Sequence, residues 1–293
     1  MKKTLKDEEL IKTGPYADIE SLPIPLHDRT WKTSNFILLW MNMAATIPTF
    51  MLGSSMIMAG LNIQTSFIVL FSGTLIMGLL VALTAITGTK YGIPFHVQAR
   101  MPFGVKGAQI PCLVRAFIAA GWYGIGIWIG ALALNSLILI NYPNWTNVPN
   151  QFLYCFIVFL ILNFATVLRI RSGSKTLFWV SSLSTFLLIV GSLIWCFLLL
   201  QNQDISQIIS SPPQVTGAAY LDVALIMLFA MTFYWSTSGV NIADYSRFCT
   251  SQKEQGIGHV VGLFTGQMIF GGIGIFVSAA GLGFIGAPIW NPI

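Results

Sequence analysis

Long runs of apolar residues, separated by short polar segments, make up most of the chain after residue 35. They cover about residues 36–60, 66–89, 113–140, 151–168, 176–200, 221–241 and 257–287. Each run is close to the roughly 20 residues that an α-helix needs to cross the hydrocarbon core of a bilayer. The pattern predicts an all-α membrane protein with about seven transmembrane helices. Residues 36–293 form its transmembrane domain, and residues 1–35 form a polar N-terminal tail.

The basic residues fall on alternate sides of these spans. All 15 Lys and Arg lie in the tail or in segments 90–115, 169–175 and 247–253, and the segments 61–65, 142–150 and 201–220 hold none. Cytoplasmic loops carry the excess of Lys and Arg. We therefore expect a multi-pass protein of the cell membrane with its N-terminal tail in the cytoplasm. The net charge of +5 follows from this topology and requires no nucleic acid partner.

The composition argues against a soluble protein and against an enzyme. Only 9% of the residues are charged, whereas soluble domains carry about a quarter. The four cysteines show no metal-like spacing and are typical of small apolar side chains. No Asp, Glu, Lys or Arg lies in the middle of a span, and His259 is near a span edge. Without metallopeptidase or phosphate-loop motifs, we expect neither catalysis nor an organic cofactor.

Two spans contain residues that disfavour a continuous helix. Pro48 in the first span removes a helical hydrogen bond and frees carbonyls near Ala44 and Ile47; a simple kink is the alternative. The sixth span holds the polar run 236–239 after an aromatic cluster, and its hydroxyls could instead bond back to their own helix. Breaks in the first and sixth spans are typical of transporters built from inverted five-helix repeats.

The third span presents a large aromatic ring among small residues. Residues 121–130 read GWYGIGIWIG, so Trp122 lies on an uncharged helix with Gly and Ala on its flanks. This pattern predicts a slot for a flat, mostly neutral small molecule. A tryptophan in a membrane helix can also be an interfacial belt residue. Trp122 and Trp235, however, lie well inside their runs.

Four segments together resemble the nucleobase–cation symporter-1 family, which includes permeases for hydantoins, allantoin, cytosine and uracil. They are ARMPFG at 99–104, GWYGIGIWIG at 121–130, WSTSGVNIADYSRF at 235–248 and APIWNPI at 287–293. The resemblance implies a LeuT-type inverted-repeat fold, normally of twelve helices. The first repeat would occupy about residues 36–200, and the second would begin at about 221–293. It also implies uptake of a nucleobase or cyclic ureide coupled to sodium or protons.

The resemblance implies a substrate site and half of an ion site. Trp122 and Trp235 match the two tryptophans that sandwich a planar ring, and stacking of this kind contributes about 1–3 kcal/mol per base in nucleic-acid complexes. The backbone carbonyls of Ala44 and Ile47 match part of a sodium site. The expected partners are thus a planar heterocycle, a coupling cation and the bilayer.

The chain departs from the family pattern in three places. Gly126 stands where some relatives carry a substrate-binding Gln, which widens the slot; alternatively, Gly126 and Gly130 form a GxxxG packing motif. Tyr234 stands where relatives often have a small residue, and its hydroxyl could replace the lost donor. The chain also ends at Ile293, just after the seventh span. We therefore expect an incomplete fold, with a non-transporting remnant as the alternative to a transporter.

Overall fold

The computed structural model describes residues 21–171, 175–201, 204–289 and 291–292, and within them it is helical without a named strand. The chain divides into two compact units, which are described separately. The first unit comprises Met1–Met43, Ile68–Arg115 and Leu225–Met268. The second unit comprises Ala44–Phe67, Ala116–Ala224 and Ile269–Ile293.

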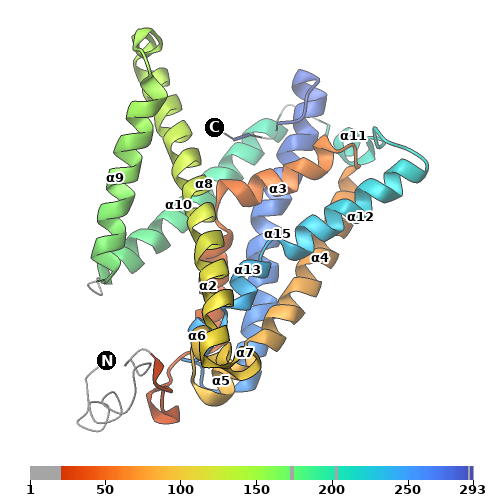
Figure 1. The fold of residues 1–293 in the computed structure, drawn as a ribbon. Coiled ribbons are helices and arrows are strands. Elements are labelled where there is room, and N and C mark those ends of the chain that lie inside the picture. Colours follow the sequence, from red (N-terminus) through yellow and green to blue (C-terminus); the bar gives the residue numbers. More distant parts are fainter. Residues whose placement is uncertain (1–20, 172–174, 202–203, 290, 293) are drawn as a thin grey trace. The chain divides into compact units, whose positions relative to one another are not determined.

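Each apolar run of the sequence coincides with one or two helices (Figure 1). Five helices of the described part are long and apolar enough to cross a membrane, or six if the bent pair α2 and α3 counts as one span. The fifth run lies in α10, in which Thr185–Leu199 forms a shorter apolar stretch. In chain order the helices are η2 (Leu26–Asp28), α2 (Thr33–Ala44), α3 (Ile47–Met58), α4 (Ile63–Thr84), α5 (Ile86–Tyr91), α6 (Phe95–Gln98), α7 (Arg100–Gly107), α8 (Gln109–Asn141), η3 (Pro143–Asn147), α9 (Gln151–Arg171), α10 (Lys175–Leu200), α11 (Ile205–Ser210), α12 (Ala218–Phe233), α13 (Ser236–Val240), α14 (Ala243–Ser246) and α15 (Gln252–Ile285).

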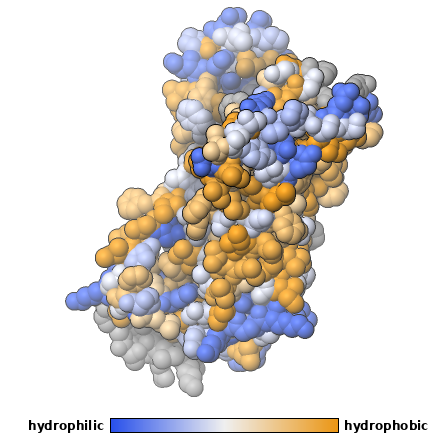
Figure 2. All heavy atoms as spheres, turned by 90° about the vertical axis from the view of Figure 1, so that its right-hand side faces the viewer, coloured by the Kyte–Doolittle hydropathy of each residue, from blue (hydrophilic) through white to orange (hydrophobic). Residues whose placement is uncertain are grey.

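Large apolar side chains on these helices remain exposed. Phe117, Ile140 and Phe164 are 77%, 79% and 60% exposed. Hydrophobic residues also cover much of the face shown in Figure 2. Soluble monomers rarely expose contiguous apolar patches of this kind, whereas lipid chains cover such side chains without cost.

In the first unit, α2 packs closely against α15 through two glycines. A Cβ at Gly258 would lie 2.7 Å from Phe36 Cβ, and one at Gly262 would lie 2.8 Å from Ile37 Cα. Glycines four residues apart form one face of a helix, and membrane helices use such faces for close backbone approach. This contact buries Phe36 and Trp40 completely.

The first span is broken rather than kinked. Helix α2 ends at Ala44 and α3 begins at Ile47, with Pro48 in its first turn. Thr46 between them is extended, with φ −140° and ψ 151°. A proline at the start of a helix loses no intrahelical bond, because the first N–H groups have no partner there. The proline therefore starts a second helix after the break.

The sixth span is interrupted by a two-residue turn, earlier than the sequence predicts, although Ala218–Val240 still forms one span. The break lies at Tyr234 and Trp235, and the polar run Ser236–Val240 forms the short helix α13. At the end of α13 the carbonyl of Gly239 accepts a hydrogen bond of 2.9 Å from the hydroxyl of Thr84 on α4. The expectation that residues 236–239 interrupt the helix was thus wrong, because contacts with α4 stabilise a turn whose own composition favours a loop.

The basic segment before the third span folds into the short helices α6 and α7, whereas α5 continues the second span. Gly92 ends α5 in the left-handed conformation at φ 72°. Gly104 bends α7 at φ 69°. Both angles favour glycine, which has no Cβ to clash with the backbone.

In the second unit, α8 and α9 form an antiparallel pair joined by η3, and they lie side by side in Figure 1. A Cβ at Gly130 would lie 2.1 Å from the Phe159 ring of α9. The ring centroids of Trp128 and Phe152 are 4.6 Å apart. At the end of the pair, Trp145 Nε1 donates a 2.9 Å hydrogen bond to Asn135 Oδ1.

We expect Gly262→Ala to lower the thermal stability of the purified protein in detergent, by about 1–3 kcal/mol, because the new methyl group forces the α2 backbone away. Gly256→Ala is the matched control, since a Cβ there meets no atom within 4 Å. It should be neutral or stabilising by up to about 1 kcal/mol, the helix preference of alanine over glycine. Equal effects of the two substitutions would contradict the proposed packing of α2 on α15.

Candidate functional site

Trp235 lies at the turn between α12 and α13, and a hydrogen bond from its ring nitrogen holds the indole in place. Its Nε1–H donates a hydrogen bond of 2.8 Å to Gln267 Oε1 on α15. Gln267 is fully buried, and its Nε2 donates to Met231 Sδ at 3.4 Å. Because the buried amide has both ends engaged, the ring of Trp235 is fixed in orientation rather than free to rotate.

A second tryptophan, Trp40 of α2, packs edge-on against Trp235. The ring centroids are 5.5 Å apart and the planes are inclined by 78°. The Trp40 Nε1–H donates to His259 Nδ1 on α15 at 2.9 Å. Edge-to-face aromatic pairs add about 0.5–1.5 kcal/mol beyond the area they bury. The first unit thus contains a tryptophan pair in which each indole N–H has a side-chain acceptor on α15.

Trp40, His259 and Gln267 are the residues of this arrangement that the sequence analysis missed. Gln267 stands alone as a long polar side chain in the apolar seventh run, and this could have marked it. His259 was noted only as lying near a span edge. In the structure it is fully buried inside α15.

Tyr234 lies next to Trp235 in the same break. The two ring centroids are 5.0 Å apart and inclined by 81°. Both side chains are partly buried. The predicted role of the Tyr234 hydroxyl as a substitute donor stays a prediction.

Trp122 and Gly126 lie on α8 in the second unit. Trp122 is 39% exposed. A Cβ at Gly126 would meet no atom within 4 Å, in contrast to Gly130, which is packed against Phe159. The packing explanation for the GxxxG pair therefore holds for Gly130 and not for Gly126. Trp122 and Trp235 belong to different units. The substrate site that the sequence predicts between their two rings therefore stays a prediction.

Ala44 and Ile47 flank the break in the first span, as expected from Pro48. The Ala44 carbonyl accepts a hydrogen bond of 2.7 Å from Thr46 N–H across the break. A carbonyl oxygen has two lone pairs, so one can still serve a cation. The side chains described contain no group of three or more His, Cys, Asp or Glu that could hold a metal ion. An ion here would depend on backbone and hydroxyl oxygens, which suit hard cations.

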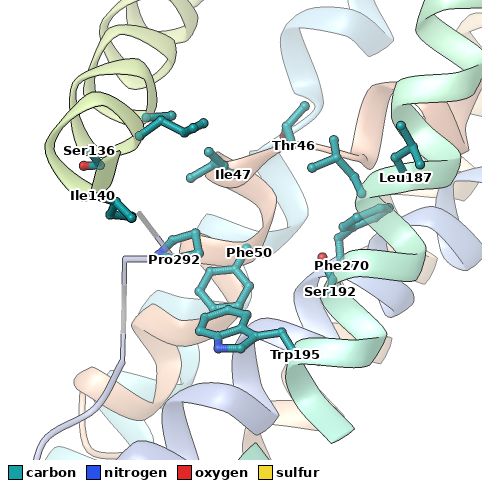
Figure 3. Close-up of a pocket in the computed structure, with 14 residues that line it drawn as sticks. Thr46, Ile47, Phe50, Ser136, Ile140, Leu187, Ser192, Trp195, Phe270 and Pro292 are labelled. Atoms are coloured by element: carbon teal, nitrogen blue, oxygen red, sulfur yellow. The ribbon is translucent and has the colours of Figure 1, made fainter. Parts of the chain in front are cut away.

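A cavity of about 420 Å³ lies in the second unit beside the first turn of α3 (Figure 3). Its walls are mainly apolar, and the rings of Phe50 and Trp195 stack at one end with centroids 5.7 Å apart. Three hydroxyl side chains add polarity: Thr46 from the break before α3, Ser136 from α8 and Ser192 from α10. Neither Trp122 nor Gly126 lines this cavity. The sequence analysis assigned no site residue to α10, which supplies Trp195 and Ser192.

A chain of polar contacts connects the segment 235–248 with Phe95 and with Arg115 near the start of α8. Arg115 Nε donates to Asn241 Oδ1 at 2.9 Å, and Asn241 Nδ2 donates to Asp244 Oδ2 at 3.1 Å. The other oxygen of Asp244 accepts from the backbone N–H of Phe95 at 2.8 Å, at the first residue of α6. Asp244 therefore satisfies a free N–H at the start of that helix. The segments 92–115 and 235–248 form one structural unit.

Comparison with known proteins identifies the family. Residues 23–293 match the family described as permease for cytosine/purines, uracil, thiamine, allantoin. The chain belongs to this family. It is 32% identical to the purine-uracil permease NCS1 of Arabidopsis thaliana over 280 residues, which are 92% of this chain and 46% of that protein. It is 30% identical to the allantoin permease of Bacillus subtilis over 295 residues, 93% of this chain and 57% of that protein.

Solved structures of Mhp1 share the fold. An inward-facing conformation of Mhp1 aligns with a TM-score of 0.77 at 21% identity, covering 93% of this chain and 57% of that one. A closed conformation with bromovinylhydantoin bound, described as a nucleobase-cation-symport-1 family transporter, aligns with a TM-score of 0.69 at 22% identity and covers 94% and 59%. The chain spans about half the length of the curated relatives it matches.

These findings confirm the family resemblance and the predicted all-α, LeuT-type membrane fold. The family is one of permeases, which confirms that the protein is not an enzyme. A multi-pass membrane protein follows from the apolar helices together with the family. The division of the chain into a tail and two repeats stays a prediction.

We expect Gln267→Leu to destabilise the protein by about 1–3 kcal/mol, because it leaves the partly buried N–H of Trp235 without its acceptor. The measurement is thermal unfolding, combined with the same substitution in a Trp235→Phe background. Without the indole N–H, the loss should be clearly smaller in the double variant. Equal losses in both backgrounds would show that the hydrogen bond to Trp235 contributes nothing.

Proposed function

We propose that the protein is a cation-coupled importer of a nucleobase or a cyclic ureide such as allantoin, hydantoin, uracil or cytosine. The observation that carries this proposal is the match of residues 23–293 to a permease family for such compounds. The tryptophan at the break of the sixth span supports it, because it gives a flat ring a rigid aromatic surface. The alternative of a non-transporting remnant gains no support from the comparisons.

In this proposal, Trp235 and Trp122 contact opposite faces of the substrate ring. Trp235 is suited to this role because Gln267 and Trp40 fix its orientation before any ligand arrives. A pre-organised wall loses little side-chain entropy on binding. Gly126 leaves space beside Trp122, and this space selects the size of ring that fits.

The coupling cation is proposed to be sodium, held in part by the carbonyls of Ala44 and Ile47. Pro48 has no N–H, so the Ala44 carbonyl cannot form the usual helical bond four residues on. Transport then follows alternating access, in which ion and ring bind beside the broken helices and one bundle moves against the other. Protons remain the alternative coupling ion.

The orientation is proposed from charge. Counting the predicted spans from the N-terminus assigns Arg100 and Lys106 of α7, and Arg247 and Lys253 near the start of α15, to the same side as the tail. The positive-inside rule places that side in the cytoplasm. The N-terminus is therefore cytoplasmic in this proposal.

Uptake of labelled uracil, allantoin, hydantoin and cytosine tests the proposal in cells that lack their own permeases, with the complete reading frame expressed. We expect uptake of at least one compound. Trp122→Ala and Trp235→Ala should each lower the apparent affinity about 5- to 100-fold, as expected for loss of a stacking contact.

Trp128→Ala is the matched control on α8, since Trp128 packs against Phe152 and is 53% exposed. Its uptake should match the wild type at equal membrane abundance. Replacing sodium by choline should abolish uptake if sodium is the coupling ion. Absence of uptake of all four compounds, with the protein present in the membrane, would refute the proposed function.

We also expect Tyr234→Phe to weaken the apparent affinity about 2- to 10-fold, because the hydroxyl replaces the donor that Gly126 lacks. Gly126→Gln in the Tyr234→Phe background should restore part of that affinity. Competition for uptake by unlabelled substrate measures both effects. If Tyr234→Phe leaves the affinity for every transported compound unchanged, the hydroxyl has no role in binding.

A further inference from the structure

His259 is a buried titratable side chain of the first unit that the proposed transport site does not use. His259 is fully buried in α15, seven residues after the start of the helix at Gln252. Its Nδ1 accepts the indole N–H of Trp40 at 2.9 Å. Its Nε2 has no hydrogen-bond partner among the described residues. A buried polar atom without a partner is costly and calls for an explanation.

The Trp40 hydrogen bond and an additional proton compete for the same nitrogen of His259. An indole nitrogen can only donate, so the nitrogen of His259 that faces it must be unprotonated. The neutral imidazole then carries its proton on Nε2. A second proton would have to go to Nδ1, where it would meet the Trp40 N–H at 2.9 Å, donor against donor. Proton binding and the Trp40 hydrogen bond therefore exclude each other in this geometry.

The surroundings of His259 contain acceptors and aromatic rings but few charges. The ring centroid of Phe36 lies 4.4 Å from that of His259, close enough for an aromatic face to attract an imidazolium. One turn earlier on α15, Gln255 Oε1 is a buried acceptor that also lacks a partner among the residues described. An acceptor one helical turn away lies on the same face of α15.

The charged and titratable groups near this site are on its margins. Helices α2 and α4 contain no Asp, Glu, Lys, Arg or His. On α15 itself, Lys253 and Glu254 occupy the first turn. From α14, Tyr245 packs against the cluster around Trp40. Burial, and then the Asp244 carboxylate, raise the pKa of Tyr245, which keeps its hydroxyl neutral. His259 is thus the group of this cluster whose side-chain type, when unperturbed, changes charge between about pH 5 and 8.

A change at Trp40 would reach Trp235 directly. The edge of Trp40 rests against Trp235 with centroids 5.5 Å apart. The same apolar cluster includes Met77, Val81 and Leu263 and surrounds both rings. Close-packed interiors of this kind transmit a side-chain movement instead of absorbing it.

We propose that His259 is a proton-binding site whose occupancy is coupled, through the hydrogen bond to Trp40, to the position of Trp235. When His259 is neutral, Trp40 is hydrogen-bonded to it and packs edge-on against Trp235. In the protonated state that bond is broken, Trp40 turns away, and the surface of Trp235 changes. The link to substrate rests on the proposed function of Trp235, whereas the competition between the proton and Trp40 does not.

The test is a pH titration of the protein in lipid nanodiscs with ¹⁵N-labelled histidine and tryptophan, followed by NMR. Comparison with His259→Asn assigns the His259 signals. We expect a neutral Nε2–H form at high pH. On acidification, protonation of His259 and loss of the hydrogen-bonded Trp40 N–H signal should share one midpoint. In Trp40→Phe the bond that favours the neutral ring is absent, so the His259 midpoint should rise by about half to one pH unit.

His27→Asn is the matched control, because the His27 side chain is 81% exposed. This substitution should leave the His259 midpoint unchanged. The proposal is overturned if His259 does not titrate between pH 4 and 9, if Trp40 keeps its hydrogen bond while His259 protonates, or if Trp40→Phe does not raise the midpoint.

A second titration at a saturating concentration of a transported compound tests the coupling to Trp235. By reciprocity of linked binding, any effect of the proton on substrate affinity must appear as a shift of the His259 midpoint. A shift in either direction supports the coupling, and an unchanged midpoint with bound substrate refutes it. If none of the four candidate compounds binds, the proposed function fails, while the first titration still decides the proton site.

Discussion

Close contact between α2 and α15 at two glycines is the constraint on which the first unit depends. A Cβ at Gly258 or Gly262 would lie within 3 Å of α2 atoms, so these positions tolerate no larger residue without movement of a helix. The short separation brings Trp40 within hydrogen-bond distance of His259. Trp40 in turn supports the ring of Trp235. The geometry of the proposed binding wall therefore originates in a backbone contact between helices.

The interruptions of the first and sixth spans impose a second constraint, which concerns hydrogen-bond partners for the backbone. Inside a bilayer, backbone groups released from a helix need partners, because lipid offers none. At the end of α13, Thr84 supplies a donor for the Gly239 carbonyl. At the end of α2, Thr46 supplies its own N–H to the Ala44 carbonyl. Both carbonyls thus have a donor, and the Ala44 carbonyl keeps a lone pair available to a cation.

The sequence was sufficient for features that depend on local chemistry and failed for those that depend on distant partners. The membrane spans follow from continuous apolar runs, and the break at Ala44 follows from Pro48 alone. The interruption of the sixth span was placed two residues too late, because α13 depends on contact with Thr84, far away in the chain. The partnership of Trp40 with His259 joins residues more than 200 positions apart, and no local pattern encodes it.

The central claim is that Trp235, held by Gln267 and Trp40, forms one wall of the substrate site. The most direct measurement is a structure of the complete protein with a transported compound bound. The account predicts the planar ring of the ligand stacked on the indole of Trp235, with the Trp235–Gln267 hydrogen bond intact and Trp122 on the opposite face. A ligand bound elsewhere, with Trp235 out of contact, would contradict it.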